Sequence, residues 1–292
     1  MGRERDDRPE QALAVKKARQ AAPPRIALTI AGLDPSGGAG LTADLRGFRA
    51  AGVWGATACA VVTVQSTRGL VSAHPIAAAV VRAQVTCVLA DMDVRAMKVG
   101  ALGSEENARA VAELLAEHRE IPAIVDPVMA PSRALESGAR LDGRASHEAL
   151  WALVRASTLV TPNADEASAL LGRAVHTPEE GRAAAEDIVR AGARAALVKG
   201  GHLGGERAID WLATARGVVA IERKRRVVPA LHGTGCTLSS LITGKLARRR
   251  ERGPVTDEEL VAAVRWARLA LDRALRAPVA VGSGARVLEV AR

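Results

Sequence analysis

The chain has 292 residues, of which 48% are hydrophobic and 25% are charged, and its formal net charge is +9. These proportions are close to those of average globular proteins, so the chain can bury a sizeable core. No run approaches the roughly 18 apolar residues of a membrane span, and residues 1–25 lack the apolar block of a secretory signal. Three cysteines in a chain of this length do not make a disulfide framework. We therefore expect a soluble, cytoplasmic protein without a membrane partner.

The positive charge could indicate a nucleic-acid partner, because basic surfaces attract phosphate backbones. However, only six of the 41 basic residues are Lys, and the Arg surplus is spread along the whole chain. One Phe, four Trp and no Tyr offer few platforms on which bases could stack. The densest basic run, Arg223–Arg226, is better explained as a solvated edge or hairpin. We expect no nucleic-acid partner.

The predicted elements begin after residues 1–25, a charged, Ala-rich segment that we expect to be disordered. Short β-branched runs predict strands at Ile26–Ala31, Thr57–Val64, Ala96–Val99, Ala123–Asp126, Leu159–Thr161 and Ala196–Lys199. Amphipathic stretches predict helices at Leu41–Ala51, Ile76–Ala90, Glu105–His118, Ser146–Ala156, Asp165–Leu171, Pro178–Ala191, Cys236–Arg250 and Asp257–Arg276. From Ile209 to Val228 the pattern changes to short strands around Arg216-Gly217, which predicts an antiparallel edge hairpin.

The alternation of strands and helices favours an α/β fold with a mostly parallel central sheet and helices on both faces. No internal repeat or change of composition follows Arg25. We therefore expect residues 26–292 to form a single domain.

A glycine-rich loop links the first predicted strand to the first predicted helix, within Ile30–Asp44. Glycines let a backbone approach a ligand closely, and a helix N-terminus offers free N–H groups. Gly32 and Gly37 have the spacing of a P-loop, but its Lys-Ser/Thr is missing. A dinucleotide fingerprint starting at Gly38 lacks the acid that should follow about 20 residues later. Two interpretations remain open: a ligand loop of another kind, or a tight turn without a ligand.

A second glycine loop, His232–Ser240, is the more specific signal. Gly233, Thr234 and Gly235 lead directly into a predicted helix, so several N–H groups can converge on one anion. Fixed dipoles of this kind stabilise the charge that develops on a transferring phosphoryl group. The loop therefore indicates a phosphoryl-transfer site.

Cys236 is predicted at the N-terminus of that helix, where the helix dipole lowers the pKa of a thiol. A thiolate there could take the proton from an attacking hydroxyl group. The alternative for a lone cysteine is a small buried hydrophobic side chain. We adopt that alternative for Cys59 and Cys87, and the catalytic interpretation for Cys236.

Seven motifs in chain order carry a resemblance to a known family. They are Ala31–Leu45, Val64–Thr67, Met97–Leu102, Val125–Met129, Val160–Glu166, Val198–Leu203 and His232–Thr237. In this order they resemble the hydroxymethylpyrimidine/phosphomethylpyrimidine kinases, a ribokinase-like family with pyridoxal-kinase relatives. The resemblance implies a ribokinase-like fold. It also implies ATP-dependent phosphorylation of 4-amino-5-hydroxymethyl-2-methylpyrimidine, and of its monophosphate, in the biosynthesis of thiamine diphosphate.

On the substrate side, the resemblance implies that the Gln65 amide binds the ring nitrogen and amino group of the pyrimidine. An amide suits this role, since it is both a donor and an acceptor. The resemblance likewise places Asp44, Gly32 and Val128 at the substrate. The alternatives remain open: Gln65 as a polar strand end, Asp44 as an acid in the first helical turn, and Val128 as plain core.

On the nucleotide side, the resemblance assigns Asn163 and Glu166 to the phosphates of ATP and their Mg²⁺, which such residues usually hold through water. A helix cap is the alternative for Asn163. Lys199 follows a hydrophobic strand, and a compact ammonium group serves as a point charge on phosphate. Thr234 and Gly235 are expected to contact the γ-phosphoryl group. With Gly233, they form an anion hole beside Cys236, the expected base.

Several residues depart from the family pattern. Leu33 replaces the usual Ser, and Thr42 replaces a Gln. The flap segment Ala130–Gly138 is longer than in the family and lacks its Lys, for which Arg133 could substitute. Because a flap excludes water during transfer, the range of substrates stays open. The alternatives are a pyridoxal kinase of the same subfamily and a non-catalytic pyrimidine-binding protein. By analogy with the family we expect a homo-oligomer, a dimer.

Overall fold

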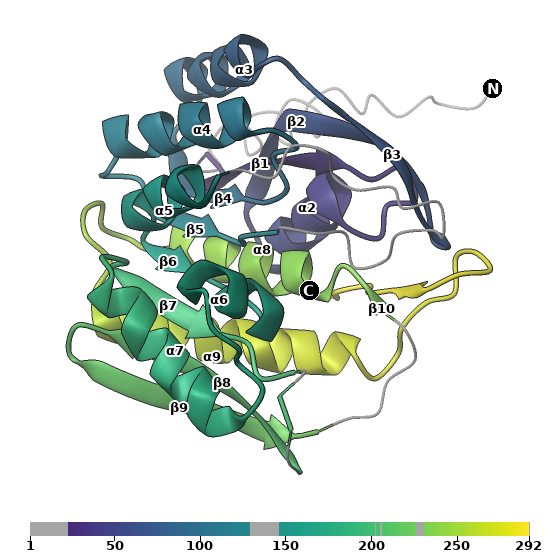
Figure 1. The fold of residues 1–292 in the computed structure, drawn as a ribbon. Coiled ribbons are helices and arrows are strands. Elements are labelled where there is room, and N and C mark those ends of the chain that lie inside the picture. The colour runs from purple at the N-terminus through teal and green to yellow at the C-terminus, as the bar shows by residue number, and fades with distance from the viewer. Residues whose placement is uncertain (1–22, 129–145, 202, 205, 226–230, 292) are drawn as a thin grey trace, which may run out of the picture.

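The computed structural model describes residues 23–128, 146–201, 203–204, 206–225 and 231–291. Within these ranges, nine strands form one sheet in the order β3-β2-β1-β4-β5-β6-β7-β8-β9 (Figure 1). The strands are β1 (Ile26–Leu33), β2 (Trp54–Ser66), β3 (Gly69–Pro75), β4 (Val94–Val99), β5 (Ala123–Val125), β6 (Leu159–Val160), β7 (Ala195–Val198), β8 (Arg207–Thr214) and β9 (Gly217–Lys224). The strands from β2 to β7 in this order pair in parallel, whereas β3, β8 and β9 pair antiparallel.

Helices cover both faces of the sheet (Figure 1). They are α2 (Gly40–Ala50), α3 (Ala78–Asp91), α4 (Glu105–Glu117), α5 (His147–Ala156), α6 (Ala164–Leu171), α7 (Pro178–Arg190), α8 (Thr234–Ala247) and α9 (Asp257–Ala274). One face carries α3 to α7, and the other carries α2, α8 and α9. The predicted α/β fold with a mostly parallel sheet is confirmed, and so are the predicted strands and helices of the described residues.

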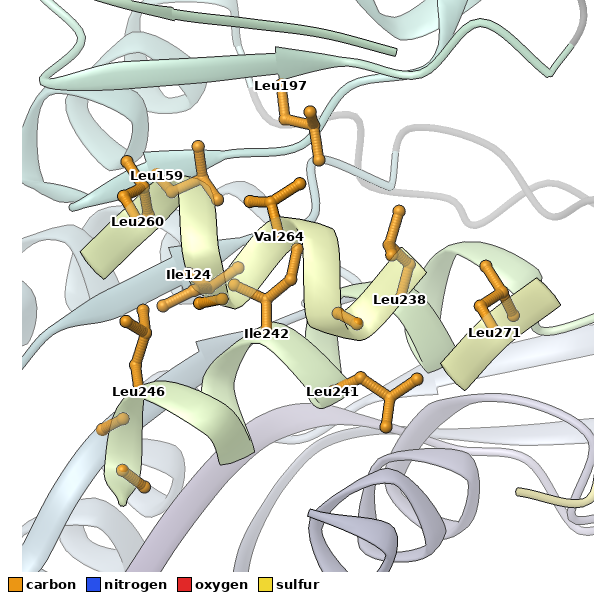
Figure 2. Close-up of a cluster of buried hydrophobic side chains, with 14 of the residues drawn as sticks. Ile124, Leu159, Leu197, Leu238, Leu241, Ile242, Leu246, Leu260, Val264 and Leu271 are labelled. Atoms are coloured by element: carbon orange, nitrogen blue, oxygen red, sulfur yellow. The ribbon is translucent and has the colours of Figure 1, made fainter. Parts of the chain in front are cut away.

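Helix α8 packs against the sheet and against the neighbouring helices α2 and α9. From Thr237 onward nearly all of its residues are buried. Figure 2 shows Leu238, Leu241 and Ile242 of α8 among side chains from the sheet and from α9. Because apolar side chains surround α8 on several sides, its N-terminus is held firmly at the carboxyl edge of the parallel strands.

The antiparallel edge hairpin predicted from Ile209 to Val228 is present as β8 and β9, which pair from Arg207 to Lys224. Strand β3 was not predicted. It forms a second hairpin with β2 at the opposite edge. Also unpredicted are β10 (Leu231–His232) and β11 (Arg286–Val287), which form a separate parallel pair among the described residues. Each has two residues, which is too short for a recognisable hydrophobic period.

Two expectations concern segments that lie wholly or mostly outside the described residues. These are the disordered segment 1–25, described only from residue 23, and the flap Ala130–Gly138 with Arg133. Among the helices that are described, none is long and apolar enough to cross a membrane.

Three residues differ in exposure from what the sequence predicted. Cys87 is exposed and Cys59 is only partly buried, so neither is a fully buried hydrophobic residue. In the basic run, Lys224 is exposed as expected, but the side chain of Arg223 is only 14% exposed. Its Nε atom lies 3.9 Å from the carboxylate of Asp272 on α9.

Candidate functional site

The two glycine loops contact each other at the carboxyl edge of the sheet. Gly233 has φ +81°, and a Cβ atom there would lie 2.0 Å from the carbonyl oxygen of Gly38. Gly40 has φ +55°, and a Cβ atom there would lie 2.1 Å from the carbonyl oxygen of Gly32. Both positions therefore require glycine, for conformation and for space. Residues that are about 195 positions apart in the chain form one surface.

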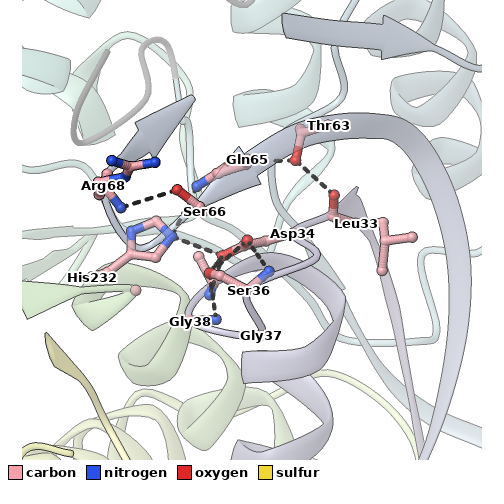
Figure 3. A network of polar contacts seen from close by, with 12 residues as sticks. Leu33, Asp34, Ser36, Gly37, Gly38, Thr63, Gln65, Ser66, Arg68 and His232 are labelled. Carbon is pink, nitrogen blue, oxygen red and sulfur yellow. Dashed lines mark hydrogen bonds and ion pairs between the residues drawn. The ribbon is translucent and has the colours of Figure 1, made fainter. Parts of the chain in front are cut away.

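Asp34 organises the first loop. Its carboxylate accepts hydrogen bonds from the backbone N–H groups of Ser36 and Ala39, both at 2.9 Å, and lies 2.8 Å from Nε2 of His232 (Figure 3). Burial would raise the pKa of Asp34, but the bonds from His232 and Ser36 hold it below its ordinary value. This role of Asp34 was not predicted. An Asp before Pro-Ser-Gly is a recognisable turn signal that could have indicated it.

Gln65 lies beside this Asp34–His232 pair. It is the penultimate residue of β2, and its amide lies 2.9 Å from Nε2 of His232 and 3.2 Å from the hydroxyl group of Thr63. The predicted substrate-reading residue thus stands where the two loops meet. The strand-end alternative describes its location correctly, and its role toward a ligand remains a prediction.

The N-terminus of α8 has the geometry expected for an anion hole. Gly233 is the N-cap, and the backbone N–H of Thr237 makes an intrahelical bond to its carbonyl oxygen at 2.9 Å. The N–H groups of Thr234, Gly235 and Cys236 precede that bond, so the helix supplies no acceptor for them. A Cβ atom on Gly235 would lie 3.2 Å from Oδ2 of Asp126 and 3.4 Å from Nζ of Lys199. The helix N-terminus therefore adjoins an acid–lysine pair.

Cys236 lies in the first turn of α8, as predicted, but its electrostatics differ from the expectation. Burial raises the pKa of its thiol to about 11, against the opposing effects of the Lys98 charge and a hydrogen bond from the Gly40 backbone. The expected lowering of the thiol pKa is therefore wrong, because burial, which disfavours a charged sulfur, has the largest effect on it. The contact with Gly40 shows that Cys236 also touches the first loop.

Lys199 and Asp126 form the charged centre of the site. Each directly follows a parallel strand, β7 or β5, and Nζ of Lys199 lies 2.8 Å from Oδ1 of Asp126 and 3.5 Å from Oε2 of Glu166. Burial opposes the charge of Lys199, yet the two carboxylates hold its pKa above the ordinary value. For Asp126, the charges of Lys199 and Lys98 outweigh burial and lower the pKa. No role was predicted for Asp126, although an acid directly after a buried strand was a usable signal.

Asn163 and Glu166 form a capping box at the start of α6. The side chain of Asn163 accepts from the N–H of Glu166 at 2.8 Å, and the carboxylate of Glu166 accepts from the N–H of Asn163 at 2.7 Å. The cap alternative for Asn163 is therefore confirmed. Burial and the charge of Asp126 raise the pKa of Glu166 to about 7, against the opposing charge of Lys199. Glu166 also lies 3.5 Å from Nζ of Lys199, and its role toward a nucleotide remains a prediction.

Asp44 is not an acid of the first helical turn, because it is the fifth residue of α2. It is fully buried, where Oδ2 accepts from Nζ of Lys98 at 2.9 Å and from Thr29 at 2.6 Å. Its Oδ1 atom has no hydrogen-bond partner within the described part of the chain. Among the described residues, the contacts of Asp44 are structural; a contact with substrate remains a prediction.

Gly32 and Val128 lie near the ends of their strands. Gly32 lies under the side chain of Val61, where a Cβ atom would be 2.8 Å from Cγ1. Val128 follows Asp126 and is partly buried. No cluster of three or more His, Cys, Asp or Glu side chains that could hold a metal ion occurs in the described ranges.

Comparisons with known proteins agree with this geometry. Residues 34–289 match the family model described as phosphomethylpyrimidine kinase. The hydroxymethylpyrimidine/phosphomethylpyrimidine kinase of Rhizobium meliloti is 39% identical over 260 residues, which cover 89% of this chain and 95% of the relative. The corresponding protein of Haemophilus influenzae is 36% identical over 262 residues, 88% of this chain and 93% of the relative.

Solved structures of phosphomethylpyrimidine and pyridoxal kinases share this fold. The phosphomethylpyrimidine kinase of Clostridium difficile is 32% identical, with a TM-score of 0.70 over 85% of this chain and 98% of that one. The pyridoxal kinase of Bacillus subtilis, in a complex with ADP, is 29% identical, with a TM-score of 0.79 over 92% and 98%. With its predicted motifs gathered at one edge of a ribokinase-like sheet, the chain belongs to the phosphomethylpyrimidine kinase family of phosphotransferases.

Proposed function

We propose that the chain transfers the γ-phosphoryl group of ATP to the hydroxymethyl oxygen of 4-amino-5-hydroxymethyl-2-methylpyrimidine, and then phosphorylates the monophosphate. The observation that carries this proposal is the position of the α8 N-terminus. It lies between the first glycine loop and the Lys199–Asp126 pair. An acceptor hydroxyl and a phosphoryl group placed there would meet free N–H groups, an ammonium group and the Cys236 thiol together.

Each group has a distinct task in this proposal. The N–H groups of Thr234, Gly235 and Cys236 stabilise the charge that develops on the transferring phosphoryl group. Lys199 adds a positive charge, which the Asp126 carboxylate orients at 2.8 Å. Cys236 accepts the proton of the attacking hydroxyl. Because burial raises its pKa to about 11, the thiol must first release its own proton to solvent, and only the small thiolate fraction present at neutral pH, which is strongly basic, acts as the base.

The residues also fit a magnesium ion bound mainly to the ATP phosphates. Mg²⁺ prefers oxygen ligands and keeps several of its waters, so one nearby carboxylate suffices. Glu166, 12% exposed and 3.5 Å from Lys199, would hold such an ion through water. The ion would neutralise phosphate charge during transfer. Asn163 would support it indirectly, by fixing the Glu166 backbone.

Pyridoxal is a second candidate substrate. Pyridoxal kinases match this fold closely, including the Staphylococcus aureus enzyme in complex with AMP-PCP and pyridoxal. That structure has a TM-score of 0.77 and 26% identity over 91% of this chain and 93% of that one. Leu33, beside the Gln65 site, is 37% exposed and departs from the family pattern, so the pocket could accept a different ring.

A parallel assay decides between these substrates. The protein is incubated with ATP and Mg²⁺ and with the pyrimidine alcohol, its monophosphate or pyridoxal, and each phosphorylated product is quantified by mass spectrometry. We expect both pyrimidines to be converted more efficiently than pyridoxal, and Cys236→Ala to lower turnover on all three. Preferential turnover of pyridoxal would replace the main proposal. The absence of any product would favour a pyrimidine-binding protein.

A further inference from the structure

Gln65, His232 and Asp34 form a continuous row of polar contacts between the two glycine loops (Figure 3). A single ring nitrogen, Nε2 of His232, lies 2.8 Å from the Asp34 carboxylate and 2.9 Å from the Gln65 amide. The side chains of His232 and Asp34 are only 12% and 4% exposed, so water does not readily replace these contacts. The chemistry of this one nitrogen therefore constrains both of its neighbours.

Nε2 of His232 must carry a hydrogen. The pKa of Asp34 is held below its ordinary value, so its carboxylate is ionised at neutral pH and can only accept. An unprotonated Nε2 would direct its lone pair at that anion. The requirement holds whether the imidazole is neutral or positively charged, because Nε2 donates in both cases.

This proton determines the orientation of the Gln65 amide. Nε2 of Gln65 faces Nε2 of His232, which would place two donors opposite each other. A half-turn of the amide, which scarcely changes its shape, brings Oε1 to His232 and the amide nitrogen to Thr63. The Thr63 hydroxyl donates to the carbonyl oxygen of Leu33 at 2.9 Å, so it is free to accept from that amide. With this orientation no two donors face each other, and the single hydrogen on Nε2 of His232 is shared between the Asp34 carboxylate and Oε1 of Gln65.

The position of His232 is itself fixed from two sides. Strand β10 pairs with β11, which places His232 opposite Val287. A Cβ atom on Gly38 would lie 2.5 Å from the imidazole Cδ2 and 2.9 Å from the Val287 side chain. The ring is therefore confined between the first glycine loop and the C-terminal strand.

We propose that His232 is a positioning residue that fixes the Gln65 amide in one orientation and thereby selects an aminopyrimidine ring. His232 occupies one lone pair of Oε1 of Gln65, and Thr63 accepts from one N–H of Nε2. The other Oε1 lone pair and the other N–H face the ligand, and their relative positions are fixed. A ring nitrogen next to an exocyclic amino group complements that arrangement. A ring without the amino donor leaves the carbonyl oxygen unpaired. This inference rests on the proposed function.

The test is a double-mutant cycle between His232 and Gln65, measured by steady-state kinetics with the pyrimidine alcohol and with pyridoxal. His232→Phe keeps an aromatic ring but removes the donor. It should raise KM for the pyrimidine alcohol about 10-fold or more, because buried polar groups lose their partners, and should leave KM for ATP unchanged. His232→Gln, which restores an N–H at similar reach, should recover most of this loss. In a Gln65→Leu background, His232→Phe should add less than about 2-fold.

If the two substitutions raised KM for the pyrimidine alcohol by factors that multiply fully in the double mutant, His232 would act independently of Gln65 and the inference would be overturned. An equal rise in KM for ATP would also overturn it. If His232→Phe fails to fold, Thr63→Val removes the other anchor of the amide. It should raise KM for the pyrimidine alcohol in the same direction, and an unchanged KM would also overturn the inference. A parent protein that phosphorylates neither ring would contradict the proposed function instead.

Discussion

Two lysines stand at the ends of parallel strands, and the structure uses them differently. Lys98 lies within the last residues of β4 and pairs with Asp44, and both side chains are 0% exposed. Lys199 directly follows β7 and pairs with Asp126, and their side chains are 13% and 2% exposed. Distances within the two pairs, 2.9 and 2.8 Å, are nearly equal. The difference lies in access: one ammonium group is sealed, and the other can reach a ligand.

The sealed pair (Lys98–Asp44) and the open pair (Lys199–Asp126) also differ in the number of carboxylates that lie near the lysine. Asp44 is the carboxylate bonded to Lys98, whereas Lys199 lies near both Asp126 and Glu166. A phosphate that binds to Lys199 would therefore meet an ammonium group that two carboxylates already keep charged and oriented. Lys98 keeps a raised pKa through Asp44, despite its burial. The Lys98 charge compensates the buried Asp44 carboxylate, and it also opposes the rise in the pKa of the Cys236 thiol.

The largest expected effect is on stability, at the sealed pair. Lys98→Met leaves the Asp44 carboxylate buried without its partner, which should lower the free energy of unfolding by about 3–5 kcal/mol. The double variant Lys98→Met with Asp44→Leu should regain most of that loss, because an apolar pair carries no desolvation penalty. Urea denaturation of the three proteins measures both effects. A loss below about 1 kcal/mol in the single variant would show that the pair is not sealed.

The next effect is on catalysis, at the open pair. Lys199→Met should lower kcat/KM by about 10²–10³-fold, the range found when one group that stabilises the transition state is removed. Its cost in stability should be smaller than that of Lys98→Met, because Lys98 still compensates the Asp126 charge. Lys224→Met, at an exposed position of β9, is the matched control and should keep parental activity. If Lys199→Met destabilised the fold as much as Lys98→Met and caused no loss in kcat/KM, Lys199 would have the structural role that is assigned here to Lys98.

The sequence predicted a role for Lys199 but none for Lys98, and the reason is physical. Both are among six lysines, and both end hydrophobic strands inside family motifs, yet only Lys199 was assigned a role. Exposure depends on which helix covers the end of the strand, and here α2 brings Asp44 to Lys98. Such long-range packing leaves no local pattern. Strands and helices were predictable because their hydrophobic periods are local.

The same limit applies to the rest of the site. The glycine loops, Cys236, Gln65, Lys199 and Glu166 were found from motifs and do converge on one edge of the sheet. The Asp34–His232 contact joins residues 198 positions apart, and β10–β11 pairs two-residue strands. Neither has a period or a spacing that could indicate it. The raised pKa of Cys236 was also missed, because burial is a property of the folded chain.

A third prediction concerns Cys236, whose thiolate form would interact with the charges of both lysines. Since burial raises the thiol pKa to about 11, its thiolate fraction should increase about tenfold per pH unit below that value. Alkylation of the ligand-free protein by iodoacetamide should therefore be about 100-fold faster at pH 10 than at pH 8. Peptide mass spectrometry separates Cys236 from Cys59 and Cys87. A rate that levels off near pH 8 would mean that the lysines, rather than burial, dominate this thiol.

The smallest expected effect is a pH dependence of the free energy of unfolding, which distinguishes the open pair from the sealed pair. Glu166, the second acid at Lys199, has its pKa raised from 4.5 to about 7 in the folded protein. The folded state therefore binds this proton more tightly than the unfolded state, and the free energy of unfolding contributed by Glu166 falls as the pH rises from about 4.5 to 7. Between pH 5 and pH 7 the fall is about 2 kcal/mol, given about 1.4 kcal/mol per pKa unit.

Glu166→Gln removes this titration, so the stability of the variant relative to the parent should increase from pH 5 to pH 7 by about that amount. Urea midpoints at both pH values measure the difference, and Glu179→Gln, at an exposed position of α7, is the control that should show no such trend. The lowered pKa of Asp126 keeps that group ionised across the whole window, so it does not contribute. A parallel pH response of parent and Glu166→Gln would place Glu166 among ordinary surface acids.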